Sequence, residues 1–265
     1  MKISVIGAGA MGGAIVEGLI KSQYVEAKDI CVSDASRKAI ERFADSGANI
    51  TTENGVAAIW GDTVIVVVKP WLVEQVLGQI KDALVYERQQ LVIVAAGIKG
   101  EQLKTWLDKD GKMIPTWLCI PNIAIAQLAS MTFLVEVAGV GDSHVEKTER
   151  LKAMFDSMGQ TIITEEKLLG AGTTLASCGI AYAMRYVRAA AEGGVELGFK
   201  ADDAKNIVMQ TMKGAVELLQ ATGLHPEAAI DLVTTPGGVT IKGLNEMEHA
   251  GFSSSVIKGL KAGAK

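Results

Sequence analysis

Several features of membrane, secreted and nucleic-acid-binding proteins are missing from this 265-residue sequence. No apolar run reaches the roughly 18 residues that a membrane-spanning helix needs. The first apolar strand starts at residue 2, so no signal peptide is expected before it. The net charge is −4 without a basic run, which argues against nucleic acid as a partner. Three widely spaced cysteines, Cys31, Cys119 and Cys178, predict neither a disulfide framework nor a metal site. We therefore expect a soluble, cytoplasmic protein.

Glycine is plentiful, and the first glycines of the chain form the pattern G-x-G-x-x-G at Gly7, Gly9 and Gly12. An apolar strand precedes them and a helix-periodic stretch follows, which is the setting of the dinucleotide-binding fingerprint. Gly7 would permit the tight turn, Gly9 would let backbone N–H groups approach a pyrophosphate, and Gly12 would let the helix pack on the strand. The helix start at Ala10 and Met11 would offer free N–H groups to the phosphates. We predict a bound dinucleotide.

The choice between NADH and NADPH stays open from the residues alone. Asp34 ends the next strand-like run, where a carboxylate can bind the adenosine ribose 2′-hydroxyl of NADH. Ser36, Arg37 and Lys38 follow and could instead hold the 2′-phosphate of NADPH. Such residues are more often part of a solvated helix face. We expect both cofactors to be used.

Two further turns follow apolar strands. Lys69 and Pro70 lie in "VVVKPW" (66–71), and Ala96 and Gly97 lie in "VAAGI" (94–98). Ligands of open parallel sheets bind beyond the carboxyl ends of the strands. We therefore expect these four residues to border the cofactor, although plain turn chemistry would also explain them.

The two parts of the chain differ in pattern. Residues 1–163 alternate short apolar strands with helices, as in a parallel sheet covered on both faces, whereas residues 164–265 show helical patterns only. The expected strands after the first are 30–34, 62–70, 91–97, 112–118, 131–137 and 161–164, and the expected helices of the second part are 165–197, 202–222, 226–233, 240–250 and 254–262. Asp202 and Gly223 are expected to cap the helix 202–222. The long, small-residue helix 165–197 predicts burial against a second subunit, with a monomeric bundle as the alternative.

A second unusual stretch, "VTTPGGVTIKGLNEMEHAGF", covers residues 233–252. Its Pro-Gly-Gly turn precedes a helix that starts near Val239 or Thr240, and its threonines add hydroxyl groups. Free N–H groups at such a helix start can hold a small carboxylate. A simple helix–helix loop with a threonine cap is the alternative.

Together, "GAGAMG", "VVVKPW", "LVIVAAGI" and "TTPGGVTIKGLNEME" make the chain resemble pyrroline-5-carboxylate reductases over essentially its whole length. The resemblance implies an α/β fold, with an N-terminal Rossmann domain of the doubly wound type and a C-terminal all-helical dimerisation domain. It also implies a homodimer or higher homo-oligomer that reduces Δ1-pyrroline-5-carboxylate to L-proline with NADPH or NADH.

The same resemblance implies roles for individual residues. Thr240 would bind the ring nitrogen of the substrate, and Asn54 would contact the adenosine end of the cofactor. The pyrroline carboxylate would lie on the turn formed by Thr235, Pro236, Gly237 and Gly238.

Two segments depart from the family pattern. Leu118 stands where the family has an arginine in R-x-M-P-N, and "ASCGIAY" (176–182) replaces S-G-S-G-P-A-Y. Because both segments normally lie near the substrate site, two alternative functions stay open. A β-hydroxyacid dehydrogenase would need a base, for which the helical part offers only His225 and His249 and no lysine in 169–184. A nucleotide-sensing protein without catalysis would not need the second glycine turn.

Overall fold

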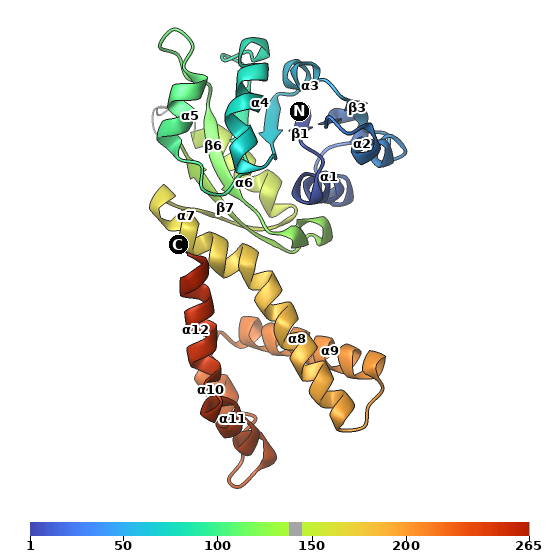
Figure 1. Cartoon of the computed structure of the whole chain (residues 1–265), viewed down its shortest axis with the longest axis vertical. Coiled ribbons are helices and arrows are strands. Elements are labelled where there is room, and N and C mark those ends of the chain that lie inside the picture. Colours follow the sequence, from blue (N-terminus) through green and yellow to red (C-terminus); the bar gives the residue numbers. More distant parts are fainter. Residues whose placement is uncertain (138–144, 265) are drawn as a thin grey trace. The chain divides into compact units, whose positions relative to one another are not determined.

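The computed structural model describes residues 1–137 and 145–264. The chain divides into two compact units, Met1–Ser177 and Cys178–Lys265. Figure 1 shows an α/β first unit and a helical second unit. Within the described ranges, no helix combines the length and the apolar character that crossing a membrane requires.

The first unit is built on a sheet whose described strands follow the order β3-β2-β1-β4-β5-β6-β7-β8. Neighbouring strands are parallel except β6 and β7, which are antiparallel. This order is the doubly wound arrangement, in which the chain reverses direction across the sheet between β1 and β4. The strands are β1 (Ile3–Ile6), β2 (Ile30–Ser33), β3 (Asn49–Thr51), β4 (Thr63–Val66), β5 (Gln90–Ile93), β6 (Thr116–Ile120), β7 (Ser130–Glu136) and β8 (Gly159–Ile163).

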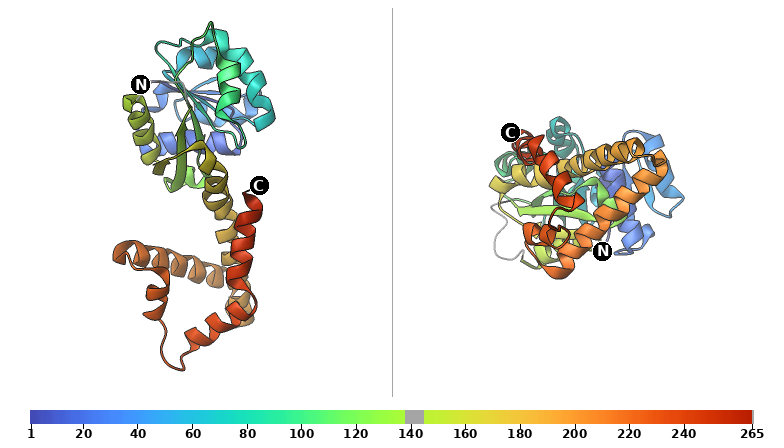
Figure 2. Two further views of the ribbon diagram at one scale, coloured as in Figure 1. Left: turned by 90° about the vertical axis from the view of Figure 1, so that its left-hand side faces the viewer. Right: turned by 90° about the horizontal axis from the view of Figure 1, so that it is seen from below.

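Helices cover both faces of this sheet (Figure 2). Alternate residues of one strand point to opposite faces, so Ile65 joins one apolar cluster and its neighbours Val64 and Val66 join the other. The helices of the first unit are α1 (Ala10–Ser22), α2 (Arg37–Ala44), α3 (Asn54–Trp60), α4 (Val73–Ile80), α5 (Gly100–Leu107), α6 (Val145–Asp156) and α7 (Leu169–Gly172). Side chains of α1, α2 and α6 belong to one cluster, and those of α3, α4 and α5 belong to the other.

The first unit extends beyond the sheet. The expected domain boundary lay after residue 163, where β8 ends, whereas the compact unit continues to Ser177. Leu169 is buried in an apolar cluster of this unit, and a Glu166 carboxylate oxygen accepts a hydrogen bond of 3.1 Å from the Gly100 N–H. These contacts hold the segment after β8 against the sheet domain.

The second unit contains α8 (Gly179–Glu196), α9 (Ala201–Thr222), α10 (Pro226–Asp231), α11 (Val239–His249) and α12 (Phe252–Gly263). The segment 165–197, expected to form a single helix, is helical from Leu169 to Glu196. It is not one continuous α-helix, because a π-helical turn, Thr173–Cys178, lies between α7 and α8. Gly223 caps α9 in the left-handed conformation, as expected. The expectation for Asp202 is wrong, because Lys200 is the N-cap of α9. Asp202 lies in the first turn, where its negative charge interacts favourably with the helix dipole.

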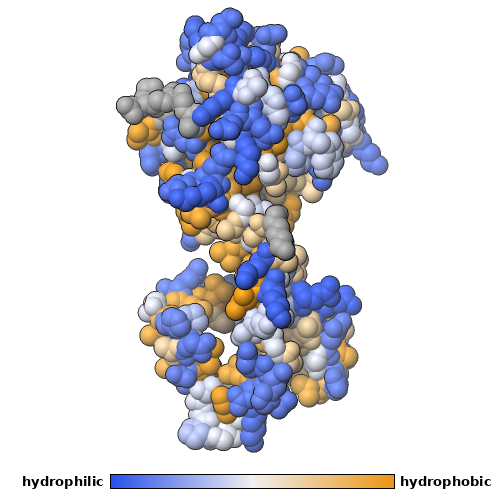
Figure 3. Space-filling view, turned by 60° about the vertical axis from the view of Figure 1, so that its left-hand side comes forward, coloured by the Kyte–Doolittle hydropathy of each residue, from blue (hydrophilic) through white to orange (hydrophobic). Residues whose placement is uncertain are grey.

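Apolar side chains are left uncovered in the second unit. Among its described residues only Ala204 and Ala229 are buried. Apolar side chains reach the surface of this unit in the lower part of Figure 3. The most exposed large ones are Leu197, Val239, Leu232 and Met184.

Candidate functional site

The first glycine turn joins β1 to α1. Gly7 has φ +101°, a conformation that L side chains rarely adopt, and a Cβ there would overlap the carbonyl oxygen of Val67. A Cβ on Gly12 would likewise overlap the carbonyl oxygen of Gly7. Gly9 is the N-cap of α1, no side chain caps this helix, and a Cβ on Gly9 would meet nothing within 4 Å. The turn is therefore tight on its inner side and open in front of the helix.

A cleft of about 430 Å³ lies in front of this turn. It is lined by Gly7, Gly9, Ala10, Met11, Gly12, Asp34, Val67, Val68, Lys69, Pro70, Leu72, Val94, Ala95 and Ala96. These residues follow β1, β2, β4 and β5, so the cleft lies at the carboxyl ends of the strands. Its volume is within the usual range for cofactor sites, and the free N–H groups at the start of α1 suit a pyrophosphate.

Asp34 is held by two backbone groups at the end of β2. One carboxylate oxygen, Oδ2, accepts a hydrogen bond of 2.7 Å from the N–H of Ala8, inside the glycine turn. The other, Oδ1, accepts one of 2.8 Å from the N–H of Ser36. The side chain thus connects the end of β2 to the glycine turn and also lines the cleft.

Four of the expected cofactor residues do not line the cleft. Ser36 is the N-cap of α2 but makes no side-chain cap bond, and Arg37 pairs with Glu41 at 3.5 Å on the exposed face of that helix. Asn54 begins α3, where its Oδ1 accepts a hydrogen bond from Ser33 Oγ and its Nδ2 donates one to Gln79. Gly97 follows Ala96 with φ +79°. Their roles toward a cofactor stay predictions.

Sequence reasoning missed the apolar part of the cleft lining. Val67, Val68 and Leu72 surround the Lys69–Pro70 turn, and Val94 and Ala95 follow β5. Val67, Val68, Val94 and Ala95 lie within "VVVKPW" (66–71) and "VAAGI" (94–98), and Leu72 directly follows the first segment, but none of the five was named as a cofactor residue. Their position after the end of a strand, and not their residue type, is the sequence feature that could have identified them as cleft residues.

The second glycine turn lies between α10 and α11. The N–H of Gly238 donates a hydrogen bond of 2.9 Å to the carbonyl of Thr235, with Pro236 and a positive-φ Gly237 between them, as in a type II turn. Gly238 is the N-cap of α11 and supplies no side chain for capping. Thr240 is exposed at the second residue of α11. No threonine side chain caps α11, so the alternative of a threonine-capped loop is wrong. The N–H groups at the start of α11 therefore remain available to an anion.

The two departures from the family pattern lie in different surroundings. Leu118 is 1% exposed in the middle of β6, where it belongs to an apolar cluster of the first unit. Ala176 lies in the π-helical turn, and its carbonyl accepts a hydrogen bond of 3.4 Å from Nδ2 of the buried Asn122. Neither Leu118 nor Ala176 lines the cofactor cleft. The missing arginine is therefore a change in the core of the sheet domain.

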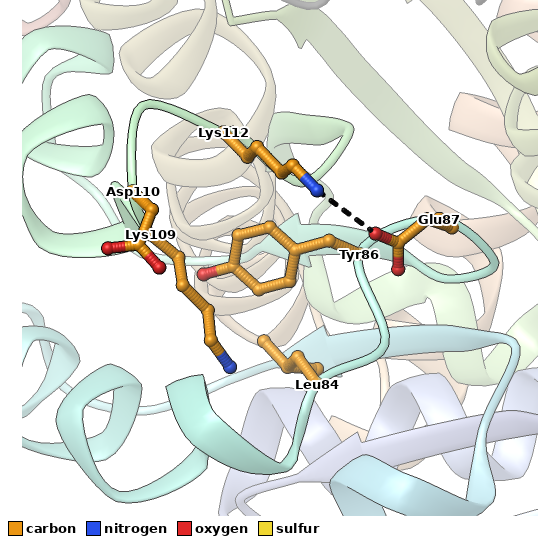
Figure 4. A pocket seen from close by; sticks show the side chains of 6 residues that line it. All are labelled: Leu84, Tyr86, Glu87, Lys109, Asp110 and Lys112. Carbon is orange, nitrogen blue, oxygen red and sulfur yellow. Dashed lines mark ion pairs between the residues drawn. The ribbon is translucent and has the colours of Figure 1, made fainter.

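A second hollow of the first unit, of about 250 Å³, has no comparable chemistry (Figure 4). Its residues precede β5 and β6, so it lies at the amino ends of these strands, away from the cleft. Lys112 pairs with Glu87 at 3.7 Å, and Tyr86 donates a hydrogen bond of 2.7 Å to the Leu107 carbonyl. Burial, together with nearby carboxylates, raises the pKa of Tyr86 to about 12. The lining residues are Leu84, Tyr86, Glu87, Lys109, Asp110 and Lys112.

Comparison with known proteins gives consistent matches. Residues 166–265 match the family described as pyrroline-5-carboxylate reductase dimerisation, and residues 2–97 match NADP oxidoreductase, coenzyme F420-dependent. Pyrroline-5-carboxylate reductase 2 of Dictyostelium discoideum is 34% identical over 99% of this chain and 91% of its own length. Pyrroline-5-carboxylate reductase 1 of the same organism is 38% identical over 97% of this chain, which spans 48% of that protein. The crystal structure of 1-pyrroline-5-carboxylate reductase from Streptococcus pyogenes has a TM-score of 0.85 and 29% identity, and covers 100% of this chain and 96% of its own.

Proposed function

The chain belongs to the pyrroline-5-carboxylate reductase family, and on that premise we propose that it reduces Δ1-pyrroline-5-carboxylate to L-proline, the final step of proline biosynthesis. Its reductant is NADH or NADPH. The observation that supports this function best is the pair of glycine turns, each placed at the start of a helix without a side-chain cap. One suits a pyrophosphate and the other suits a small carboxylate.

The residues of the first unit fit a nicotinamide dinucleotide. The open space at Gly9 leaves room for a pyrophosphate directly in front of α1. Asp34 lies at the strand end where an adenosine ribose binds in such folds, and Lys69, Pro70 and Ala96 lie beyond β4 and β5. When bound, the reduced nicotinamide supplies a hydride for the imine carbon of the substrate, ring carbon C2, which becomes C5 of proline.

The chain itself has little chemistry to perform, because an imine is already an electrophile. Its task is to hold the substrate in place, which is a positioning effect. The turn of Thr235–Gly238 and the first N–H groups of α11 bind the substrate carboxylate. The Thr240 hydroxyl donates a hydrogen bond to the ring nitrogen, which becomes the amine of the product. A threonine hydroxyl is too weak an acid to titrate near neutrality, so it orients the ring and passes a proton on from water.

The described residues of the second unit give the two alternatives no support. A β-hydroxyacid dehydrogenase needs a base, but His225 caps α10 by accepting the N–H of Glu227, and His249 is exposed beside Glu246. A protein that only senses nucleotides would have no use for a second anion site at α11.

The assay for this proposal is the oxidation of NADH and NADPH by the purified protein, with and without the pyrroline. We expect oxidation that depends on the pyrroline and yields proline in equal amount. A 3-hydroxyacid with NAD⁺ or NADP⁺ is the control substrate for the dehydrogenase alternative. Turnover of that acid alone, or no turnover of the pyrroline, would contradict the proposed function.

We further propose a homodimer, or a higher homo-oligomer, built through residues 165–222, in the cytoplasm. Apolar exposure supports the assembly, because the described part of the second unit buries so few of its own side chains. The cysteines support a reducing compartment: Cys31, Cys119 and Cys178 are all free thiols. Burial raises the pKa of Cys31 to about 11 and that of Cys119 well above its usual value, so neither is a reactive thiolate.

Sedimentation at micromolar concentration tests the assembly. We expect the wild-type protein to sediment as a dimer or larger, and Gly179→Trp, at the start of α8, to shift it toward the monomer. Gly78→Trp is the matched control, since a Cβ on Gly78 in α4 meets nothing within 4 Å and this glycine is exposed in the sheet domain. A monomeric wild-type protein would contradict the proposal.

A further inference from the structure

The carboxylate of Asp34 occupies a fixed position in the cofactor cleft. Its two oxygens accept hydrogen bonds of 2.7 Å and 2.8 Å from the N–H groups of Ala8 and Ser36. Ala8 is 5% exposed, so its N–H has little access to water as a substitute partner. Because backbone groups hold it from two sides, the carboxylate cannot turn away from an incoming ligand without losing these bonds.

We propose that Asp34 makes NADH the preferred cofactor of this protein and, at the same time, positions the glycine turn. Each carboxylate oxygen has a second lone pair that remains able to accept a ribose hydroxyl. A 2′-phosphate at the same place would put about two further negative charges against a fixed one. The preference for NADH as a reductant rests on the proposed function, whereas the preference in binding does not.

Of the groups near Asp34 that could compensate a 2′-phosphate, Arg37 and the N–H of Ser36 are already engaged, and Lys38 is exposed on α2. Arg37 forms an ion pair with Glu41 at 3.5 Å, and the N–H of Ser36 donates to Asp34 itself. Using Arg37 for the phosphate would require it to leave an acidic partner, and a phosphate held by Arg37 or Lys38 would still lie beside Asp34. Specificity here comes from a repulsive element as much as from an attractive one.

Direct titration of the protein with NADH and with NADPH, at neutral pH and low salt, measures the preference without any substrate. We expect the Kd for NADPH to exceed that for NADH by at least about tenfold, because the repulsion acts at short range in a partly enclosed cleft. The difference should shrink as salt is added, since screening weakens the repulsion. A role of Asp34 that is only structural would not respond to salt in this way.

Two variants of Asp34 distinguish the effect of its negative charge from the effect of its hydrogen bond to the glycine turn. Asp34→Asn keeps an oxygen that can accept the Ala8 N–H, so we expect the Kd ratio to fall by about tenfold with little change in NADH binding. Asp34→Ala removes the anchor as well, so the ratio should fall similarly while the Kd values for both cofactors rise about tenfold relative to the Asn variant. Asp29→Asn is the matched control, because it removes one negative charge just before β2, at the other end of the same strand.

Two results would overturn the proposal: a wild-type protein that binds NADPH as tightly as NADH, or a Kd ratio that Asp34→Asn leaves unchanged. Failure of the proposed function gives a different result. In that case NADH would still bind more tightly than NADPH, but pyrroline-dependent oxidation would be absent.

Discussion

Replacing Gly9 with valine is expected to abolish binding of both NADH and NADPH while leaving the fold intact. The backbone of Gly9 has φ −64° and ψ −165°, which a valine can adopt, and its Cβ would meet nothing within 4 Å. The added side chain would fill the space in front of α1 where phosphate oxygens need to reach free N–H groups. Loss of two charge-assisted hydrogen bonds would weaken binding by at least about 100-fold.

The measurement combines circular dichroism and thermal unfolding with cofactor titration. Gly12→Val is the contrasting variant, because its Cβ would overlap the carbonyl oxygen of Gly7 and should lower the melting temperature. The two variants are therefore expected to differ. Gly9→Val should lose cofactor binding at an unchanged melting temperature, whereas Gly12→Val should have a lower melting temperature. Normal cofactor binding by Gly9→Val would show that the pyrophosphate does not lie on this turn.

Thr240→Val is expected to lower kcat/KM for the pyrroline by about 10- to 150-fold, which corresponds to one hydrogen bond to a charged or charge-developing group. Valine keeps the shape of threonine and removes only the donor. Thr240 is exposed and does not cap α11, whose N-cap is Gly238. Melting temperature and cofactor affinity should therefore change little, and Thr240→Ser should recover part of the activity because the hydroxyl returns.

Thr211→Val is the matched control for this substitution. Its hydroxyl is also exposed on a helix of the second unit, but it donates to the carbonyl of Ile207 within α9. We expect full activity from this variant. A stable and fully active Thr240→Val protein would exclude the role proposed for this hydroxyl.

The strands and helices that could be predicted are those whose apolar pattern dominates their sequence. The central strands β1, β4 and β5 are buried throughout and appear as short apolar runs with turns at their ends. The sequence does not indicate β3 and α3, because β3 is a three-residue strand that is partly exposed and α3 has only seven residues. Short elements of this kind depend on their neighbours more than on their own sequence.

The candidate site was predictable where backbone conformation demands glycine and less so where side chains bind backbone groups. Gly7, Gly12 and Gly237 mark turns by residue type alone, and the structure explains each by a close approach or a positive φ. The bond from Ala8 to Asp34 joins residues 26 positions apart, and no local pattern encodes it. Leu118 is a further residue whose surroundings the sequence does not indicate. Its burial within β6 shows that this departure from the family pattern lies in the core of the sheet domain.

The position of β1 at the centre of the sheet bears on how the protein is made. β1 pairs with β2 and β4, so the four strands β1 to β4 are contained in one continuous stretch of chain, residues 3–66. Domains fold as units, with the N-terminal one first during synthesis, so half of the cofactor cleft can form early. The helices that expose apolar side chains follow the sheet domain in the chain and are therefore synthesised after it. If the proposed homo-oligomer covers these side chains, they are exposed to aggregation from their synthesis until a second copy binds.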